Sequence, residues 1–446
     1  MISYSRSTKT PTGFLFLVTV GMLYFLAAGC AKDSTIEVQK TSEILAFIAS
    51  DQHKGRHAFS PEIKVVEAYI ANEFKKAGLK KLPTYKSFQQ DFTISEYQIR
   101  EVRGTINGTF IQEDHLFGRV YSDSLRWTSK NTAYYQVQTL GPTDSFRGRF
   151  NELSRSTDAT LVFVHSSHSD IFRRYQQYYS RPSRTLKTVN TDVVFVLVPD
   201  GFQANEDIYD LQIYTEKKQF TLANITGQIH GRRSDEIVLF SAHHDHIGIR
   251  TAVEADSIAN GANDNGSGVT AIIQLAHYFA SLPTPERSIY FATFTAEEMG
   301  GYGSEYFSKQ LNPDQIVAMF NIEMIGKPAV SGPNSAWITG YERSSFGQIL
   351  SNSTPDSIYT FYPDPYPNQN LFFRSDNRTL ARLGVPAHSI STTPIDVDQD
   401  YHQVSDEFDT INLNHLNSTI KAIARAAKSI ISGADTPTRI DPETVN

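Results

Sequence analysis

The chain has 446 residues, of which 40% are hydrophobic and 20% are charged, and its formal net charge at pH 7 is −7. This composition is typical of a globular protein, and the length suits one large domain with an insertion or two domains. A mildly acidic chain without basic runs argues against nucleic acid as a partner.

The N-terminus has the pattern of an export signal. Arg6 and Lys9 precede a mostly apolar stretch from Phe14 to Ala28, which is short for a membrane span and fits the core of a signal peptide. The stretch runs into Gly29 and Cys30, and Cys30 is the only cysteine in the chain.

Small residues before a lone cysteine resemble a bacterial lipoprotein cleavage site, although Ala27 stands where Leu is usual. We therefore expect residues 1–29 to be a lipoprotein signal peptide and Cys30 to carry the lipid. A plain secretory peptide is the alternative. The mature protein would then be exported and anchored to a bacterial membrane, with the outer membrane as the expected one, on its periplasmic side or at the cell surface. No thiol would remain for a disulfide or a metal.

The first part of the mature chain, residues 30–97, is predicted to belong to the main domain. Apolar spacing predicts helices over 37–50 and 61–78, and Gly78 is a helix stop. From about 98 to 222 the sequence becomes rich in Tyr, Arg, Ser and Thr and holds only short strand-like runs. We interpret residues 98–222 as an inserted α/β or β-rich domain.

From Asn224 onward, strands and helices alternate. The pattern predicts strands over 236–242, 288–294, 316–322 and 387–391, and helices near 266–281 and over 413–432. Continuous apolar strands joined by helices predict an α/β domain over 223–433. Its central sheet would be mixed but largely parallel, and flanked by helices. The polar tail, residues 434–446, is expected to be disordered.

Metal-type ligands gather where these strands run out into loops. They are His243, Asp264, the pair Glu297 and Glu298, Glu323 and His402. In an open α/β sheet, a site forms beyond the carboxyl ends of the strands. If one member of the glutamate pair binds metal, the set has two imidazoles and three carboxylates. Such a set suits a pair of zinc ions roughly 3.5–4 Å apart that clamp an attacking water, and Mn or Co stay open.

Local spacing separates ligands from their neighbours. His243 and Asp245 leave an extended segment on the same side, so Asp245 can hold one ring nitrogen while the other binds metal. His244 should point away, and His246 is expected not to be a ligand. Asp264 lies in a Gly/Asn-rich loop, where an Asp by itself indicates a turn or a helix cap, but it follows the His-x-Asp strand closely and can bridge two cations.

Glu297 and Glu298 are adjacent at a strand end and therefore point in different directions. One of the two can bind metal while the other faces the substrate as a general base.

Six ordered motifs resemble those of the di-zinc aminopeptidase family, which also includes glutamate carboxypeptidases and, more remotely, glutaminyl cyclases. The motifs are SAHHDHIG (241–248), NGANDNGSG (260–268), FTAEEMG (294–300), NIEMIG (321–326), FRSD (373–376) and YHQVSD (401–406). The resemblance covers roughly 37–97 and 223–432 and implies the zinc-exopeptidase, phosphorylase/hydrolase-like fold. The inserted residues 98–222 stand where many relatives carry a protease-associated domain, which they match poorly.

The resemblance also implies a role for each matching position. His243, Asp264 and Glu323 would hold one zinc ion, and Asp264, Glu298 and His402 the other. Glu297 would be the general base, Asp245 would orient His243, and Tyr401 would polarise the scissile carbonyl. Two positions depart from the family pattern: Glu323 stands where Asp is common, and Asn377 stands where many relatives have His.

The expected activity is therefore metal-dependent removal of residues from peptides, above all from the N-terminus, with no obligate protein partner. Two alternatives remain open at this point. One is glutaminyl cyclisation on the same scaffold, which usually uses one zinc. The other is a non-enzymatic binding module, although such relatives typically lose ligands that this chain keeps.

Overall fold

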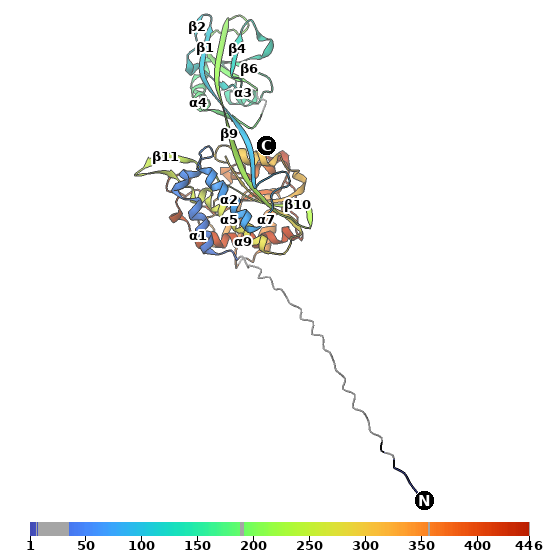
Figure 1. The fold of residues 1–446 in the computed structure, drawn as a ribbon. Coiled ribbons are helices and arrows are strands. Elements are labelled where there is room, and N and C mark those ends of the chain that lie inside the picture. Colours follow the sequence, from blue (N-terminus) through green and yellow to red (C-terminus); the bar gives the residue numbers. More distant parts are fainter. Residues whose placement is uncertain (6, 8–34, 188–190, 356, 446) are drawn as a thin grey trace. The chain divides into compact units, whose positions relative to one another are not determined.

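The computed structural model describes residues 1–5, 7, 35–187, 191–355 and 357–445 (Figure 1). The core of the expected signal peptide and Cys30 lie outside the described residues. The chain divides into two compact units, Met1–Asp33 and Ser34–Asn446, and the second holds every element described below. In the described part of the chain, no helix is both long enough and apolar enough to cross a bilayer.

A large mixed sheet forms the centre of the second unit. Its strand order is β16-β15-β17-β14-β10-β13-β9-β1-β2, with β4 also paired to β9 and β7 to β1. The strands from residue 233 onward are β10 (Arg233–His243), β13 (Arg287–Phe294), β14 (Ile316–Ile322), β15 (Ser335–Ile338), β16 (Thr360–Pro363) and β17 (Ala387–Ser391). The run β17-β14-β10-β13 is parallel throughout, and β9 pairs antiparallel with β13. The predicted mixed, largely parallel sheet is thereby confirmed.

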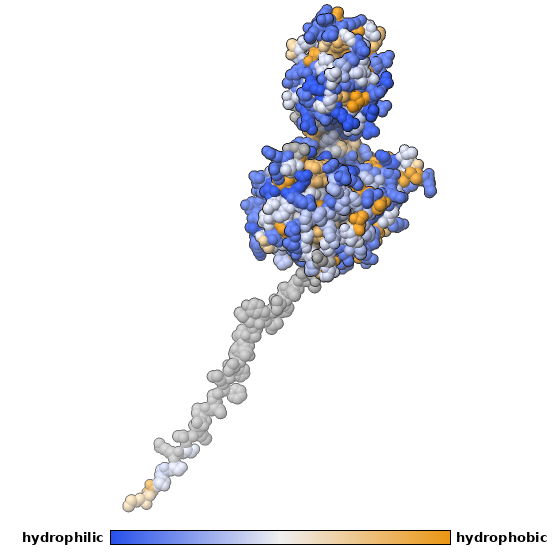
Figure 2. Space-filling model, turned by 180° about the vertical axis from the view of Figure 1, so that it is seen from behind, coloured by the Kyte–Doolittle hydropathy of each residue, from blue (hydrophilic) through white to orange (hydrophobic). Residues whose placement is uncertain are grey.

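Helices cover both faces of this sheet, because its strands are apolar on both sides. In β10, Val238 and Phe240 face one core cluster, while Ile237 and Leu239 face another. The first core is closed by α1 (Val38–Ile48), α2 (Ile63–Ala77), α5 (Gly268–Ser281), α7 (Phe346–Ser353) and α9 (Leu413–Ser432). The second core is closed by α6 (Tyr302–Ser308) and α8 (Asn377–Ala381). The visible surface is largely hydrophilic, with small separate apolar patches (Figure 2).

A long two-stranded ribbon leads from the sheet into the inserted residues. β1 (Gln89–Ile106) and β9 (Tyr209–Ile229) pair antiparallel from Gln89↔Ile225 to Ile106↔Tyr209. The expected domain limits, 98 and 222, therefore fall within continuous strands. The ribbon also carries β2 (Thr109–Phe110), β4 (Ser124–Thr128) and β7 (Ser183–Thr185).

The inserted residues have a core of their own. A second sheet has the order β3-β8-β6-β5, formed by β3 (Leu116–Arg119), β8 (Val193–Val198), β6 (Thr160–His165) and β5 (Gln136–Leu140). Two helices, α3 (Phe146–Leu153) and α4 (Ser169–Tyr179), contribute Phe150 and Phe172 to an aromatic cluster on one face of it. The inserted domain thus has α/β structure.

The C-terminal tail differs from the expectation of disorder. Ile440 and Val445 are buried, and the Arg287 guanidinium donates a 2.7 Å hydrogen bond to the carbonyl of Asp435. Two apolar side chains and the backbone bonds of this segment hold it against the domain, although its composition is mostly polar. The structure also contains a short hairpin that the sequence analysis did not predict, formed by β11 (Gly248–Val253) and β12 (Asp256–Ala259).

Candidate metal centre

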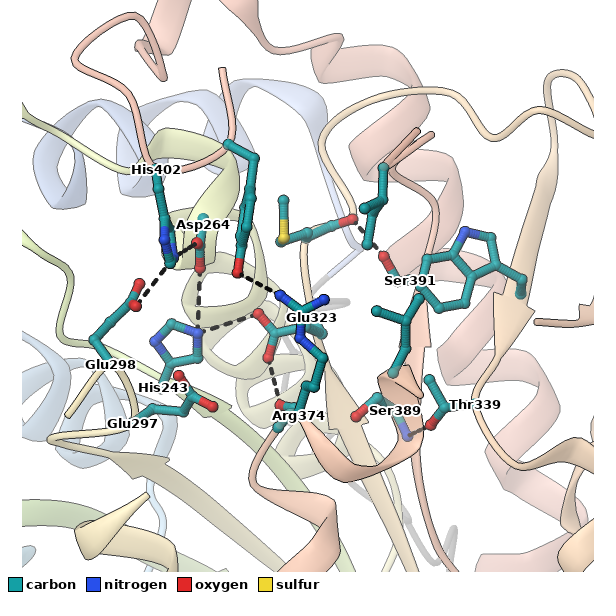
Figure 3. A pocket seen from close by; sticks show the side chains of 16 residues that line it. His243, Asp264, Glu297, Glu298, Glu323, Thr339, Arg374, Ser389, Ser391 and His402 are labelled. Carbon is teal, nitrogen blue, oxygen red and sulfur yellow. Dashed lines mark hydrogen bonds and ion pairs between the residues drawn. The ribbon is translucent and has the colours of Figure 1, made fainter. Parts of the chain in front are cut away.

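The candidate ligands lie together at one edge of the central sheet. β10 ends at His243, β13 leads to Glu297 and Glu298, and β14 leads to Glu323. Because these strands are parallel neighbours, their carboxyl ends meet at the same edge. The turn η5 (Ala262–Ser267), which precedes α5, and the loop after β17 bring in the remaining two, Asp264 and His402 (Figure 3).

Asp264 lies between two imidazoles and contacts each with a different oxygen. His243 Nε2 is 3.3 Å from Asp264 Oδ1, and His402 Nε2 is 3.3 Å from Asp264 Oδ2. On the outer sides, His243 Nε2 is 3.1 Å from Glu323 Oε1, and His402 Nε2 is 3.0 Å from Glu298 Oε2. The five side chains therefore form two sets that share Asp264 (Figure 3).

The carboxylates of the site create a negative potential that favours positive charge on the two histidines. Burial alone would lower the pKa of His402, but its hydrogen bonds to Asp264 and Glu298 raise it to about 10. Burial also opposes the charged form of His243, yet Glu323 and Asp264 bring its pKa well above the usual value. Carboxylates packed this closely stabilise any nearby cation. A largely buried set of imidazole nitrogens and carboxylate oxygens fits divalent zinc.

Glu297 lines the same cavity beside His243 (Figure 3). Its backbone N–H donates to Asp245 Oδ1 at 3.1 Å, which leaves its own carboxylate directed at the cavity. Burial raises the pKa of Glu297 well above its ordinary value, with His243 opposing and the neighbouring carboxylates adding to the shift. The preceding residue, Ala296, has a φ of 57°, an unusual backbone conformation of the kind that clusters at functional sites.

The other two histidines of the motif SAHHDHIG, His244 and His246, belong to neither of the two ligand sets. His244 Nδ1 is 3.1 Å from Thr293 Oγ1, and its side chain is fully buried. His246 Nδ1 is 2.8 Å from Glu298 Oε1, so His246 supports a ligand. His243 Nδ1 lies 3.1 Å from the backbone carbonyl of Asp245 and 3.8 Å from that residue's carboxylate. Asp245 thus meets the ring chiefly through its main chain.

Asp406, from the motif YHQVSD, and Arg56, which lies outside the six motifs, hold the loops of the site. The Asp406 carboxylate accepts hydrogen bonds from the backbone N–H groups of Asn263, at 2.8 Å, and Asp264, at 2.9 Å. Arg56 is fully buried and donates to the carbonyls of Ile48, His244, Asn260 and Gly261. Their partners are backbone atoms, and no spacing of side chains reveals such contacts.

Two further side chains complete the inner surface. Ser375 Oγ donates to Glu323 Oε2 at 2.7 Å and so fixes the other oxygen of that carboxylate. The Tyr401 ring stacks on His402 with centroids 4.0 Å apart, and the Tyr401 hydroxyl lies 3.4 Å from Arg374 Nη2. The lining of the cavity includes the apolar residues Trp337, Leu371 and Ile395, which belong to one hydrophobic cluster.

The chain is similar to known aminopeptidases in sequence. Aminopeptidase YwaD of Bacillus subtilis is 28% identical over 151 residues, which cover 32% of this chain and 31% of that protein. Leucine aminopeptidase 2 of Trichophyton rubrum is 27% identical over 235 residues, which cover 46% of this chain and 44% of that protein. The chain thus matches between about a third and a half of the length of these relatives.

Solved structures share the fold. An aminopeptidase from Aneurinibacillus sp. strain AM-1 matches with a TM-score of 0.53 and 20% identity, over 90% of this chain and 94% of that one. A zinc aminopeptidase from Bacillus subtilis matches with a TM-score of 0.53 and 14% identity, over 91% and 98%. The family model described as peptidase family M28 matches residues 224–427, which include every candidate ligand. Residues 224–427 of this chain therefore match peptidase family M28, in agreement with the resemblance of the sequence motifs to metal-dependent aminopeptidases.

Proposed function

We propose that this protein is a zinc-dependent exopeptidase that removes N-terminal residues from peptides. One observation supports the proposal above all: Asp264 lies between His243 and His402, with one oxygen toward each imidazole, and Glu323 and Glu298 flank the pair. His243, Asp264 and Glu323 would hold one ion, and Asp264, Glu298 and His402 the other. When bound, such ions supply Lewis acidity toward a water and a carbonyl oxygen.

The remaining steps fall to residues of the chain. Glu297 would accept the proton of the attacking water and pass it to the amine that leaves, because its carboxylate faces the cavity and no ligand contact occupies it. The Tyr401 hydroxyl would donate a hydrogen bond to the carbonyl oxygen. The apolar wall formed by Trp337, Leu371 and Ile395 would receive the side chain of the N-terminal residue.

The decisive experiment uses purified protein without residues 1–30. We expect about two zinc ions per chain by plasma mass spectrometry, and hydrolysis of leucine p-nitroanilide but not of its N-acetyl derivative. Glu297→Gln should lower kcat by about a thousandfold, because general acid–base catalysis contributes roughly 10²–10⁴-fold. Its zinc content should be unchanged. Glu305→Gln, on the neighbouring helix α6, is the matched control, because its carboxylate pairs with Lys309 at the surface. Full activity of zinc-loaded Glu297→Gln would refute the mechanism.

The same preparation separates the alternatives. A glutaminyl cyclase would convert an N-terminal glutamine into pyroglutamate without releasing an amino acid. A binding module would do neither, whatever its zinc content.

We also propose that the protein is exported and lipidated at Cys30. Metabolic labelling with palmitate in a bacterial host should mark the wild-type chain and place it in the membrane fraction. Cys30→Ala should lose both properties. Equal labelling of the two chains would exclude this site of lipidation.

A further inference from the structure

A second, larger cavity adjoins the metal centre. His246, Glu298 and Met299 are among the residues that line it. Glu298 also lines the first cavity, so the two spaces meet at this candidate ligand. The inserted domain contributes to the lining through residues of β3, α4 and the segment that leads into β7.

The lining of this cavity is strongly cationic. Arg119, Arg181, Arg184 and Arg250 all contribute to it, and among the described residues Glu298 is its one acid. Arg184 is neutralised by Glu96, with 2.8 Å between guanidinium and carboxylate. No carboxylate among the described residues forms an ion pair with Arg119, Arg181 or Arg250. Clefts lined by one sign of charge concentrate ligands of the opposite sign.

Tyrosines complete the wall. Tyr121, Tyr178, Tyr179 and Tyr302 line the cavity, and the Tyr178 side chain is 64% exposed. The Arg119 guanidinium lies 5.2 Å from the centre of the Tyr179 ring, which holds it at the wall. Tyrosine rings pack against extended peptide and their hydroxyls donate hydrogen bonds. The chemistry of the cavity thus suits a peptide segment that carries negative charge.

The direction of the substrate follows from the two cavities. In the proposed function, the first cavity takes the N-terminal side chain against its apolar wall, so the rest of the peptide must leave on another side. The second cavity begins at Glu298, beside the bond to be cut. Each extended residue adds roughly 3.3–3.6 Å, so two to four residues beyond the cut would reach into the arginine-lined space.

We infer that this arginine-lined cavity binds carboxylate groups on the departing part of the substrate, which makes short or acidic peptides the favoured class. The inference rests on the proposed function. Two sources supply a carboxylate at this distance: the C-terminus of a short peptide, and an Asp or Glu side chain within a longer one.

The test compares kcat/KM for four peptides of equal length. They are Leu-Ala-Ala-Ala with a free C-terminus, the same peptide as its amide, Leu-Ala-Glu-Ala-amide and Leu-Ala-Lys-Ala-amide. We expect each carboxylate peptide to exceed the neutral amide about fivefold at low salt, since electrostatic attraction in a charged cleft raises the association rate. The lysine peptide should fall below the neutral amide. Raising ionic strength should shrink these ratios.

Arginine variants test whether the preference for carboxylate peptides arises from this cavity. Arg181→Gln, in the inserted domain, and Arg250→Gln, in β11, change exposed side chains of the cavity, and each should reduce the ratio of carboxylate to amide peptide by about half or more. Arg173→Gln, which removes an exposed arginine of α4 outside the cavity, should leave the ratio unchanged. The salt series on the wild-type chain needs no variant and so does not depend on variant folding.

Each outcome decides the matter. A preference for the free C-terminus only assigns the site to the end of short peptides, and a preference for the glutamate peptide only assigns it to acidic side chains. Equal rates on all four peptides, or a preference that Arg181→Gln and Arg250→Gln leave intact, would overturn the inference. Hydrolysis of leucine p-nitroanilide would still stand in that case, so failure of the inference is distinct from failure of the proposed function.

Discussion

Asp406 acts on the candidate metal centre through the main chain. Each of its oxygens accepts one backbone N–H bond, from Asn263 and Asp264, and the side chain is almost fully buried. Burial raises the pKa of Asp406 to about 6, which its two backbone hydrogen bonds oppose. Asp406 thereby holds the backbone of Asp264, while His243 and His402 hold its carboxylate.

Replacing Asp406 should weaken metal binding without removing a ligand. Asp406→Asn keeps one acceptor and places an N–H₂ group against a backbone N–H, so the turn should shift. We expect zinc affinity to fall about tenfold or more, the effect typical of outer-shell partners. Competition with a chromogenic chelator measures it. Asp409→Asn, an exposed position three residues on, should leave the affinity unchanged. Equal affinities for both variants would contradict this role.

The buried side chain of His388 makes the stability of the folded chain depend on pH. Its Nδ1 lies 2.8 Å from the carbonyl of Thr339, its Nε2 lies 2.7 Å from Ser344 Oγ, and the side chain is fully buried. Burial lowers its pKa from 6.5 to about 4, and the nearby Arg343 adds to the shift while the Thr339 carbonyl opposes it. The unfolded chain therefore takes up this proton at a higher pH than the folded chain does.

Stability due to His388 should be complete above pH 6.5 and should be lost as the pH falls toward 4. Integrated over that range, the change in the free energy of unfolding is about 3 kcal/mol. Urea unfolding at pH 7 and pH 4.5 measures it. The loss should be clearly smaller in His388→Gln than in the wild type, and His230→Gln, at an exposed site, should behave like the wild type. Identical acid losses in all three chains would disprove the link.

At the scale of elements, the turn before α5 depends on Gly261. Its φ is +56°, and an added Cβ would lie 2.1 Å from the carbonyl oxygen of Asp264 and 2.5 Å from the His246 ring. Both neighbours belong to the centre, and neither can move without disturbing it. Position 261 therefore requires glycine for two reasons: its neighbours leave no room for a Cβ atom, and its backbone is in the left-handed conformation.

Gly261→Ala should lower the free energy of unfolding by about 3 kcal/mol, because overlap adds to the strain of the left-handed conformation. The variant should also bind less zinc. Gly78→Ala is the control, since Gly78 has a φ of +84° and open space around it. That change should cost only about 1 kcal/mol. Thermal unfolding of both variants tests the difference, and equal costs would show that overlap plays no part.

The sequence predicted the long elements well and the short ones poorly. β17 and α9 begin and end at the predicted residues, because an unbroken apolar run and a long apolar stripe mark them. α8 has five residues and β15 only four, too few for any period to show. The five candidate ligands could be predicted because their side chains are of metal-binding types. The hydrogen bonds from Arg56 to four backbone carbonyls could not be predicted, because residue spacing does not indicate contacts with the main chain.

At the scale of the molecule, the inserted domain is connected to the rest of the chain through one pair of strands, β1 and β9. All candidate ligands lie between residues 243 and 402, outside the ribbon and everything it carries. The part that holds the candidate ligands and the inserted part each have a main hydrophobic core of their own. The M28 part should therefore fold without the insertion.

Excision tests this directly. Ser95 and Gln219 are paired across the ribbon, so joining them through Asn-Gly closes a two-residue hairpin in the existing register. We expect a single cooperative thermal transition and the same zinc content as the full chain. The closing turn Gly-Pro, which does not favour such a hairpin, serves as the comparison and should be less stable. Failure of both shortened chains to fold would show that the insertion is part of the folding unit.

The ribbon also fixes the two points at which the inserted residues begin and end. Because Ile106 and Tyr209 are held opposite each other, whatever joins them starts and ends at one fixed spacing. The entropy of closing such a loop grows only with the logarithm of its length. New sequence can therefore accumulate beyond the ribbon at little thermodynamic cost and without moving the candidate ligands. The surface that the inserted residues form can change while the candidate metal centre stays as it is.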